Sequence, residues 1–386
     1  MAPHRRLIPF ATPWMGEAEI EAVQRVIASG WIYQGPVVQE FERRFADYVG
    51  AKYACAVSSC TTALHLALIV AGVRPGDEVI TVSHSFIATS NSIRYCGAVP
   101  VFTDIQAETY NIAPELIEDL ITERTRAILC VHQMGMPCDL KSIIDVARRY
   151  SLKVVEDAAC AAGSEILWKD KWERIGKPRG DVACFSFHPR KVLTTGEGGM
   201  ITTSNREWNE QFRLLRQHGM SMSTDQRHAA NEVIFESYPV LGYNYRMTDI
   251  QAAIGIEQLK RLPEMVKQRR FLADRYEDLL ADVVGVRLPE EPAWALSNWQ
   301  SYCVALPYAS DQRKVMQYML DRGVASRRGV MCVHREIPYA NVSNPCLLHE
   351  SEKAQDHSII LPLFHQMSSE DQDYVVEVLK EACCAT

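Results

Sequence analysis

The amino-acid sequence predicts an α/β protein, with a large domain built on a mostly parallel sheet and a smaller α+β domain towards the C-terminus. Short runs rich in β-branched residues alternate with longer stretches whose apolar residues recur at helical spacing, and this pattern changes after about Gly255. A chain of 386 residues is also long enough for two domains with buried cores. We therefore expect a large domain over residues 1–255 and a small domain over residues 256–386.

The large domain is expected to contain five buried strands, because five short segments combine apolar and β-branched residues. They are residues 78–83, 98–102, 126–132, 153–157 and 182–187. Between them, residues 115–121 and 142–150 show apolar residues at helical spacing. This alternation implies a mostly parallel sheet covered by helices on both faces, and ligands bind beyond the carboxyl ends of such strands.

The small domain is expected to mix helices with a strand. Residues 257–283 indicate helices that are interrupted or restarted at Pro263, with many charges on one face. A strand-like segment at residues 301–307 and a helical segment at residues 313–323 follow.

The composition is typical of an ordinary globular protein, with 47% hydrophobic and 23% charged residues. A net charge of -7 and a pI near 5.9 argue against nucleic-acid binding. The twelve cysteines are scattered without zinc-like spacing, so we expect no metal site and free thiols in a reducing cytoplasm. No signal peptide is evident at the N-terminus, and the most apolar stretch, residues 61–73, is too short to span a bilayer.

The segment "FHPRKVLTTGEGGM", residues 187–200, places a lysine before a glycine cluster, and three interpretations of Lys191 compete. It could be a solvated loop lysine, as most lysines are. It could belong to a phosphate-binding loop, although a P-loop carries its lysine after the glycines. It could also form a Schiff base with pyridoxal phosphate.

The Schiff-base interpretation requires three further features, and the chain offers all of them. A carboxylate must keep the cofactor's ring nitrogen protonated, and Asp157 follows a predicted strand. A helix N-terminus with hydroxyls must hold the phosphate, as in "SSCTTALHLAL" from Ser58. An apolar plane must face the ring, which Phe86 can present. Each feature alone is more often structural, but together they favour the cofactor.

At this point the sequence resembles the DegT/StrS sugar aminotransferases, which are pyridoxal-phosphate enzymes of fold type I. Five blocks resemble the family's motifs, and the last two are highly specific: residues 29–68, 86–105, 154–164, 185–203 and 242–259. The family's dehydrating subgroup has histidine in place of the lysine. Because Lys191 is present, the resemblance favours transamination over dehydration.

The resemblance implies a role for each matching residue. Lys191 would form the Schiff base, Asp157 would hold the pyridinium, and Phe86 would stack on the ring. The phosphate would bind at the helix start and the lysine block, through Ser59, Cys60, Thr61 and Ser186. Asn244 would reach a phosphate across a dimer interface, which implies a homodimer with shared active sites.

Two positions depart from the family pattern. Cys60 stands where the family usually has glycine, and Cys160 stands where it usually has glutamine or histidine near the cofactor's O3′. A thiol is a poor hydrogen-bond donor, so the O3′ contact is in question.

The expected reaction transfers an amino group, from L-glutamate by family resemblance, to a keto group of a nucleotide-linked deoxy sugar. Lys191 would serve as both anchor and base, and its ordinary pKa of about 10.4 would have to be lowered by burial beside the cationic cofactor. A cofactor-binding regulatory protein without turnover and a nucleotide-binding module remain as alternatives.

The segment 326–339 concentrates basic residues in an otherwise acidic chain: Arg327, Arg328, His334 and Arg335. A solvated basic loop and a diphosphate clamp are about equally plausible from the residues alone. In the family, the corresponding segment lies near the sugar-nucleotide pocket, which favours the clamp.

Overall fold

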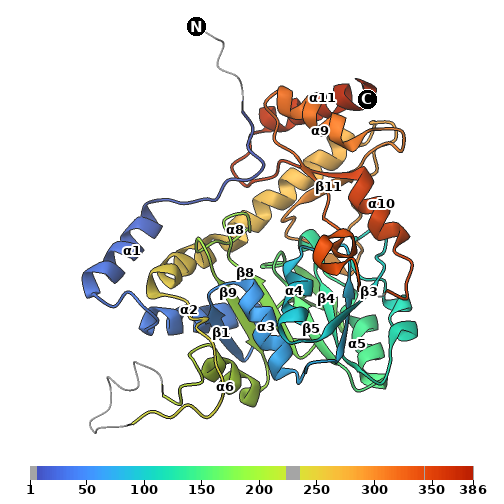
Figure 1. The fold of residues 1–386 in the computed structure, drawn as a ribbon. Coiled ribbons are helices and arrows are strands. Elements are labelled where there is room, and N and C mark those ends of the chain that lie inside the picture. Colours follow the sequence, from blue (N-terminus) through green and yellow to red (C-terminus); the bar gives the residue numbers. More distant parts are fainter. Residues whose placement is uncertain (1–6, 223–234, 343, 386) are drawn as a thin grey trace.

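A seven-stranded sheet forms the centre of the larger part of the protein (Figure 1). The computed structural model describes residues 7–222, 235–342 and 344–385. The strand order is β1-β9-β8-β5-β4-β2-β3, and the pairs from β8 to β3 are all parallel, whereas β9 runs antiparallel to β8 and β1. The bounds are β1 Tyr53–Val57, β2 Glu78–Val82, β3 Val99–Thr103, β4 Thr125–Val131, β5 Lys153–Asp157, β8 Val182–Ser186 and β9 Gly199–Thr203. The five strands predicted from the sequence are confirmed.

Helices cover both faces of this sheet, because successive strand residues point to opposite sides. In β1, Cys55 and Val57 join the core on the side of α3, whereas Ala54 and Ala56 join the core on the side of α2. The first face carries α3 Cys60–Val70, α4 Ala88–Tyr95 and α6 Arg206–Leu215; the second carries α2 Pro36–Val49, α5 Leu140–Arg149 and α8 Asp249–Leu280. Helix α1 Glu17–Ser29 packs on α8 (Figure 1).

Two predicted elements differ from the structure. Helix α8 continues through Pro263 without interruption, because buried residues on both sides of the proline, such as Leu262 and Met265, hold the helix in place. The predicted domain division at residues 255 and 256 falls inside this helix. Residues 115–121 form two short 3-10 helices, η1 Pro114–Leu116 and η2 Glu118–Leu120, in place of one helix.

The C-terminal part contains a second core around the far half of α8. A three-stranded antiparallel sheet of order β11-β13-β12 packs there with two helices. The bounds are β11 Tyr302–Ala305, α9 Gln312–Asp321, β12 Arg327–Arg328, α10 His349–His357, β13 Ser358–Leu361 and α11 Ser369–Ala385. The predicted strand at 301–307 and helix at 313–323 are therefore confirmed. The remaining strands form a small sheet of β10 Ala295–Leu296, β6 Glu165–Trp168 and β7 Lys171–Arg174. The remaining short helices are the 3-10 turns η3 Gln133–Gly135, η4 Val333–Arg335 and η5 Ile337–Tyr339.

All twelve cysteines are free thiols, as predicted. Within the described residues, none of the helices combines the length and the apolar character needed to cross a membrane. We expect no signal peptide at the N-terminus, and residues 1–6 of that segment lie outside the described residues.

Candidate active site

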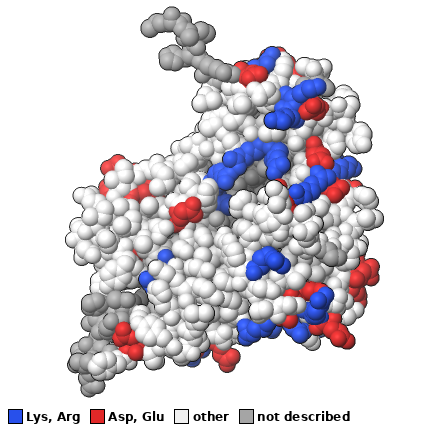
Figure 2. Space-filling model, in the orientation of Figure 1, with Lys and Arg blue, Asp and Glu red and all other residues white. Residues whose placement is uncertain are grey.

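A cavity of about 700 Å³ opens at the carboxyl edge of the large sheet and reaches the C-terminal part of the chain. Strands β5 and β8 end at this edge, and α3 begins there. The lining includes Lys191 and Asp157, and Figure 2 shows Lys and Arg side chains gathered around a hollow on one face of the protein. The sheet thus places its strand ends where α/β proteins bind ligands.

Lys191 lies on the loop after β8 and points to the loop after β5. Its Nζ donates a hydrogen bond to Cys160 Sγ over 3.0 Å. Burial alone would lower the pKa of Lys191, but the charges of Cys160 and Asp157 outweigh burial and leave it above its ordinary value. The predicted lowering is therefore not produced by the groups of this chain, and would require the positive charge of a bound cofactor.

Asp157 ends β5 and is 4% exposed. Its Oδ2 accepts a hydrogen bond from Thr89 Oγ1 at 2.8 Å, and its Oδ1 accepts one from the Ala159 amide at 3.1 Å. Burial raises the pKa of the Asp157 carboxyl, although these donors and Lys191 favour the carboxylate. No basic side chain in the described part of the chain forms an ion pair with Asp157 within 4.0 Å. A buried carboxylate of this kind fits a protonated ring nitrogen.

The N-terminus of α3 supplies backbone N–H groups and hydroxyls at the same edge. Ser59 caps the helix, because its hydroxyl accepts from the Thr62 amide. Gly199, at the start of β9, lies so close that a Cβ there would be 2.5 Å from the Ser59 carbonyl carbon and 2.8 Å from the Cys60 nitrogen. Ser59, Cys60 and Thr61 all line the cavity, and this arrangement suits a phosphate.

Cys60 directs its thiol towards β5 and β8. Its Sγ lies 3.5 Å from the carbonyl oxygen of Cys184 and 4.0 Å from Asp157 Oδ1. Burial raises the pKa of the Cys60 thiol well above its ordinary value. The Cys60 side chain therefore packs against Cys184 and Asp157, and the fold accommodates a side chain at the position where the family usually has glycine.

The other predicted cofactor residues divide into two groups. Phe86, Cys160 and Ser186 line the cavity, and Phe86 is 65% exposed, so its ring is available to a ligand. Asn244 is exposed and does not line the cavity of its own chain.

The four basic residues of segment 326–339 also separate. Arg327 and Arg328, on β12, line the cavity. His334 instead contacts Ser83 Oγ at 2.7 Å and Glu352 Oε1 at 3.0 Å. Arg335 bonds to Asp356 Oδ1 at 2.7 Å. The structure therefore does not bring His334 and Arg335 to the cavity with the other two.

Several lining or supporting residues were not predicted. Thr89 supports Asp157, and its place three residues after Phe86 was a signal that could have found it. Phe10 lines the cavity, and the Arg327 guanidinium lies 5.2 Å from the centre of its ring. Gln300 lines it as well and donates to the Arg190 carbonyl. Only the folded chain brings these distant segments together.

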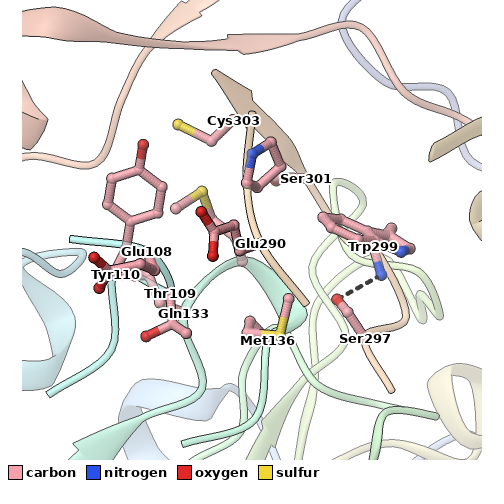
Figure 3. A pocket seen from close by; sticks show the side chains of 12 residues that line it. Glu108, Thr109, Tyr110, Gln133, Met136, Glu290, Ser297, Trp299, Ser301 and Cys303 are labelled. Carbon is pink, nitrogen blue, oxygen red and sulfur yellow. Dashed lines mark hydrogen bonds between the residues drawn. The ribbon is translucent and has the colours of Figure 1, made fainter. Parts of the chain in front are cut away.

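A second cavity of about 20 Å³ lies beside the first and shares Gln133, Met134 and Ser301 with it. Figure 3 shows Tyr110, Trp299 and Cys303 closing around it. It has room for about one water molecule, so it is no substrate site.

The site combines a lysine and an aspartate that follow neighbouring strands with a helix N-terminus, all at the carboxyl edge of a mostly parallel sheet. This combination defines a pyridoxal-phosphate enzyme of fold type I. The profile of the DegT/DnrJ/EryC1/StrS aminotransferase family matches residues 13–380. The chain belongs to this family and is a pyridoxal-phosphate-dependent aminotransferase.

Three similar proteins cover nearly the whole chain. GDP-perosamine synthase from Caulobacter vibrioides is 38% identical, over 97% of this chain and 98% of the relative. Spore coat polysaccharide biosynthesis protein SpsC from Bacillus subtilis is 37% identical, over 97% of this chain and 96% of the relative. The solved PLP form of Spr1654 from Streptococcus pneumoniae has a TM-score of 0.89 and 28% identity, over 98% of this chain and 99% of that one.

Proposed function

We propose that this aminotransferase transfers an amino group from L-glutamate to a keto group of a nucleotide-linked deoxy sugar. One observation carries the proposal: the cavity that holds Lys191 and Asp157 extends to Arg327 and Arg328. A volume of about 700 Å³ suits a ligand larger than an amino acid. The name of the GDP-perosamine synthase relative supports a sugar nucleotide, and that of SpsC supports a role in making a polysaccharide.

Each residue of the chemical end has a task that follows from its position. Pyridoxal phosphate, when bound, supplies the electron sink of the reaction. Asp157 would hold the proton on the cofactor's ring nitrogen, and Ser59, Thr61 and Ser186 would bind its phosphate at the start of α3. The amine of Lys191 would take the proton from Cα of the amino donor and would deliver it to the cofactor carbon that comes to carry the amino group. In the second half of the reaction, Lys191 would move the proton in the opposite direction.

The arginines at the other end would bind the diphosphate of the sugar nucleotide. A guanidinium presents a planar fork that matches phosphate oxygens two at a time. Arg328 Nη2 lies 3.9 Å from Glu336 Oε1, too far for a direct hydrogen bond, so its donors can turn to a ligand. Arg335 is bonded to acidic residues of α10 and would not take part.

We also place the enzyme in a homodimer in the cytoplasm. Asn244 would reach the phosphate in the partner's cavity, since it is exposed and lies outside its own. Large apolar side chains that precede it in the chain are also exposed, with Phe235 at 90% and Leu241 at 85%, and a partner surface would cover them. Twelve free thiols suit a reducing compartment.

The first experiment separates the enzyme from a cofactor-binding protein without turnover. Purified holoenzyme is mixed with L-glutamate, and the visible absorption of the bound cofactor is followed. We expect the band to disappear as the amino form accumulates and to return when a suitable keto sugar nucleotide is added, with a panel of UDP, dTDP and GDP sugars identifying it. Lys191→Ala is the control and should show neither change. A wild-type spectrum that glutamate and other amino acids leave unchanged would refute the proposal.

The second experiment tests the diphosphate clamp. Arg327→Ala and Arg328→Ala should each reduce kcat/KM for the sugar nucleotide by about ten- to a hundredfold, because each removes a charge-assisted hydrogen bond of about 1.5–3 kcal/mol. The half-reaction with glutamate should stay near its wild-type rate. Arg335→Ala is the matched control from the same segment and should leave both half-reactions unchanged. If all three variants behave alike, the clamp is absent.

A further inference from the structure

The cavity contains a contact that the proposed reaction does not require. Lys191 Nζ donates to Cys160 Sγ over 3.0 Å, and both residues line the cavity. A sulfur at this distance takes one of the three donors of the amine. The amine is thereby held at the end of the cavity where Asp157 lies.

The backbones of both partners are tied to the same segment, residues 298–300. Asn298 Nδ2 donates to the carbonyl oxygens of Cys160 and Ala162 at 2.9 and 2.8 Å. Gln300 Nε2 donates to the carbonyl oxygen of Arg190 at 3.2 Å, next to Lys191 in the chain. Two loops far apart in the sequence are therefore held at a fixed separation, so the contact between the side chains is built into the fold.

The charges around the amine favour its protonated form. Burial opposes the positive charge, whereas Cys160 and Asp157 favour it, and the balance keeps the pKa of Lys191 above its ordinary value. His188 and Arg190 on the amine's own loop add no negative charge. Cys160 stands first among the groups that favour the ammonium and is the one that touches it.

We infer that Cys160 is a positioning residue for Lys191: its sulfur holds the amine at the Asp157 end of the cavity whenever the lysine is not bound to another group. The inference rests on the proposed function for its catalytic meaning, but the contact can be tested without the reaction. It gives the thiol a partner in the protein itself, whatever contact it makes with the cofactor.

The first test uses the cofactor-free protein and iodoacetamide, with alkylation of Cys160 followed by peptide mass spectrometry. The Lys191 amine contacts the sulfur that iodoacetamide attacks, and a cation there stabilises the negative charge of the reacting sulfur. We therefore expect Lys191→Ala to slow the alkylation of Cys160 severalfold near neutral pH. Lys191→Arg, which keeps a cation, should recover much of the rate. Exposed Cys384 serves as the internal reference and should react equally in all proteins. Equal rates at Cys160 in all three proteins would overturn the inference.

The second test also uses the cofactor-free protein and reads the pH dependence of reductive methylation of Lys191 by peptide mass spectrometry. Cys160→Ala should move this profile to lower pH, because Cys160 is the first group that favours the ammonium, and Cys160→Ser, which keeps a hydrogen-bonding group, should move it less. A merely structural cysteine would leave the profile unchanged in both variants, and that result would also overturn the inference. If the wild-type protein failed to transaminate any substrate, the proposed function would fall, while the alkylation result would still decide whether Cys160 holds Lys191.

Discussion

Replacing Thr89 by valine tests how the fold supports the aspartate of the active site. Thr89 Oγ1 donates to Asp157 Oδ2 at 2.8 Å and lies 2.8 Å from Ser85 Oγ. All three side chains are buried, with exposed fractions of 1% for Thr89, 4% for Asp157 and 1% for Ser85. Valine has nearly the same shape as threonine, so the substitution removes the hydroxyl without opening a cavity.

The expected loss of stability follows from these contacts. A hydrogen bond to a charged acceptor contributes about 1.5–3 kcal/mol, and a buried hydroxyl left without its partner costs about 1 kcal/mol or more. Because Thr89→Val removes the bond to Asp157 and also leaves Ser85 without its partner, we expect the unfolding free energy of the cofactor-free protein to fall by about 2–4 kcal/mol near neutral pH. Thr89→Ser keeps the hydroxyl and should retain most of the wild-type stability.

The loss should depend on pH in a defined direction. Burial raises the pKa of Asp157 in the folded protein, and the Thr89 bond opposes that rise. A folded carboxyl with a raised pKa binds more protons than the unfolded one, so stability falls as pH rises from about 3.9, the unfolded value, through the folded value. Thr89→Val raises the folded pKa further, so its stability deficit should be smallest at low pH and grow towards neutral pH.

Thermal and urea unfolding of cofactor-free wild type, Thr89→Val and Thr89→Ser, at several pH values between about 4 and 8, would measure this. A valine variant as stable as wild type at neutral pH would refute the reasoning. So would a deficit that does not change with pH, because it would arise from packing and not from the bond to the carboxylate.

Three further predictions concern other parts of the site. Asp157→Asn should make the cofactor-free protein more stable at neutral pH, because it removes a buried carboxylate whose pKa is raised, and urea unfolding would measure this. The same substitution should lower the transamination rate at least tenfold in half-reaction kinetics, because the cofactor's ring nitrogen would lose its carboxylate partner. Gly199→Ala should weaken cofactor affinity by about tenfold or more in a binding titration, because the new Cβ would collide with the Ser59 backbone. Mixing Asn244→Ala with Lys191→Ala subunits should restore part of the activity if Asn244 acts in the partner's site, and demonstrably mixed dimers without activity would contradict the shared site.

Five of the seven strands of the large sheet were predictable because each is buried on both faces and is a short apolar run. Residues 153–157 match β5 at both ends, and the other four predicted strands agree within one residue at each end. Strands β1 and β9 were not predicted as strands, since β9 begins inside the glycine cluster that drew attention as a loop. In helix α8, by contrast, the sequence predicted a break at Pro263 that the structure does not have. Packing along this long helix outweighs the loss of the one hydrogen bond that proline removes.

The meeting of Lys191 and Asp157 in one cavity was more predictable than the contacts that support them. Lys191 and Asp157 follow from residue type, from position after a strand and from the resemblance. Their partners Cys160 and Thr89 lie on the loop after β5 and in the first turn of α4, so the contacts that these side chains make are set by the fold. The arginine segment shows the same limit, because Arg327 and Arg328 lie on β12 and line the cavity, whereas His334 and Arg335 lie on η4 and contact acidic residues of α10.

The two ends of the cavity are positioned by different sheets, and this separation has a consequence for substrate binding. Lys191 and Asp157 follow β8 and β5 of the large sheet, whereas Arg327 and Arg328 are fixed by their pairing with Ile360 and Ile359 of β13 in the small sheet. A change on β12 would therefore alter the contacts to the proposed sugar nucleotide without moving Lys191 and Asp157. We expect substitutions at Arg327 and Arg328 to weaken the use of every keto sugar nucleotide that the enzyme accepts, while the glutamate half-reaction keeps its rate and pH profile. A variant of either arginine that slowed both half-reactions in parallel would mean that the small sheet also sets the geometry of the lysine, through residues such as Gln300 that join it to the lysine loop.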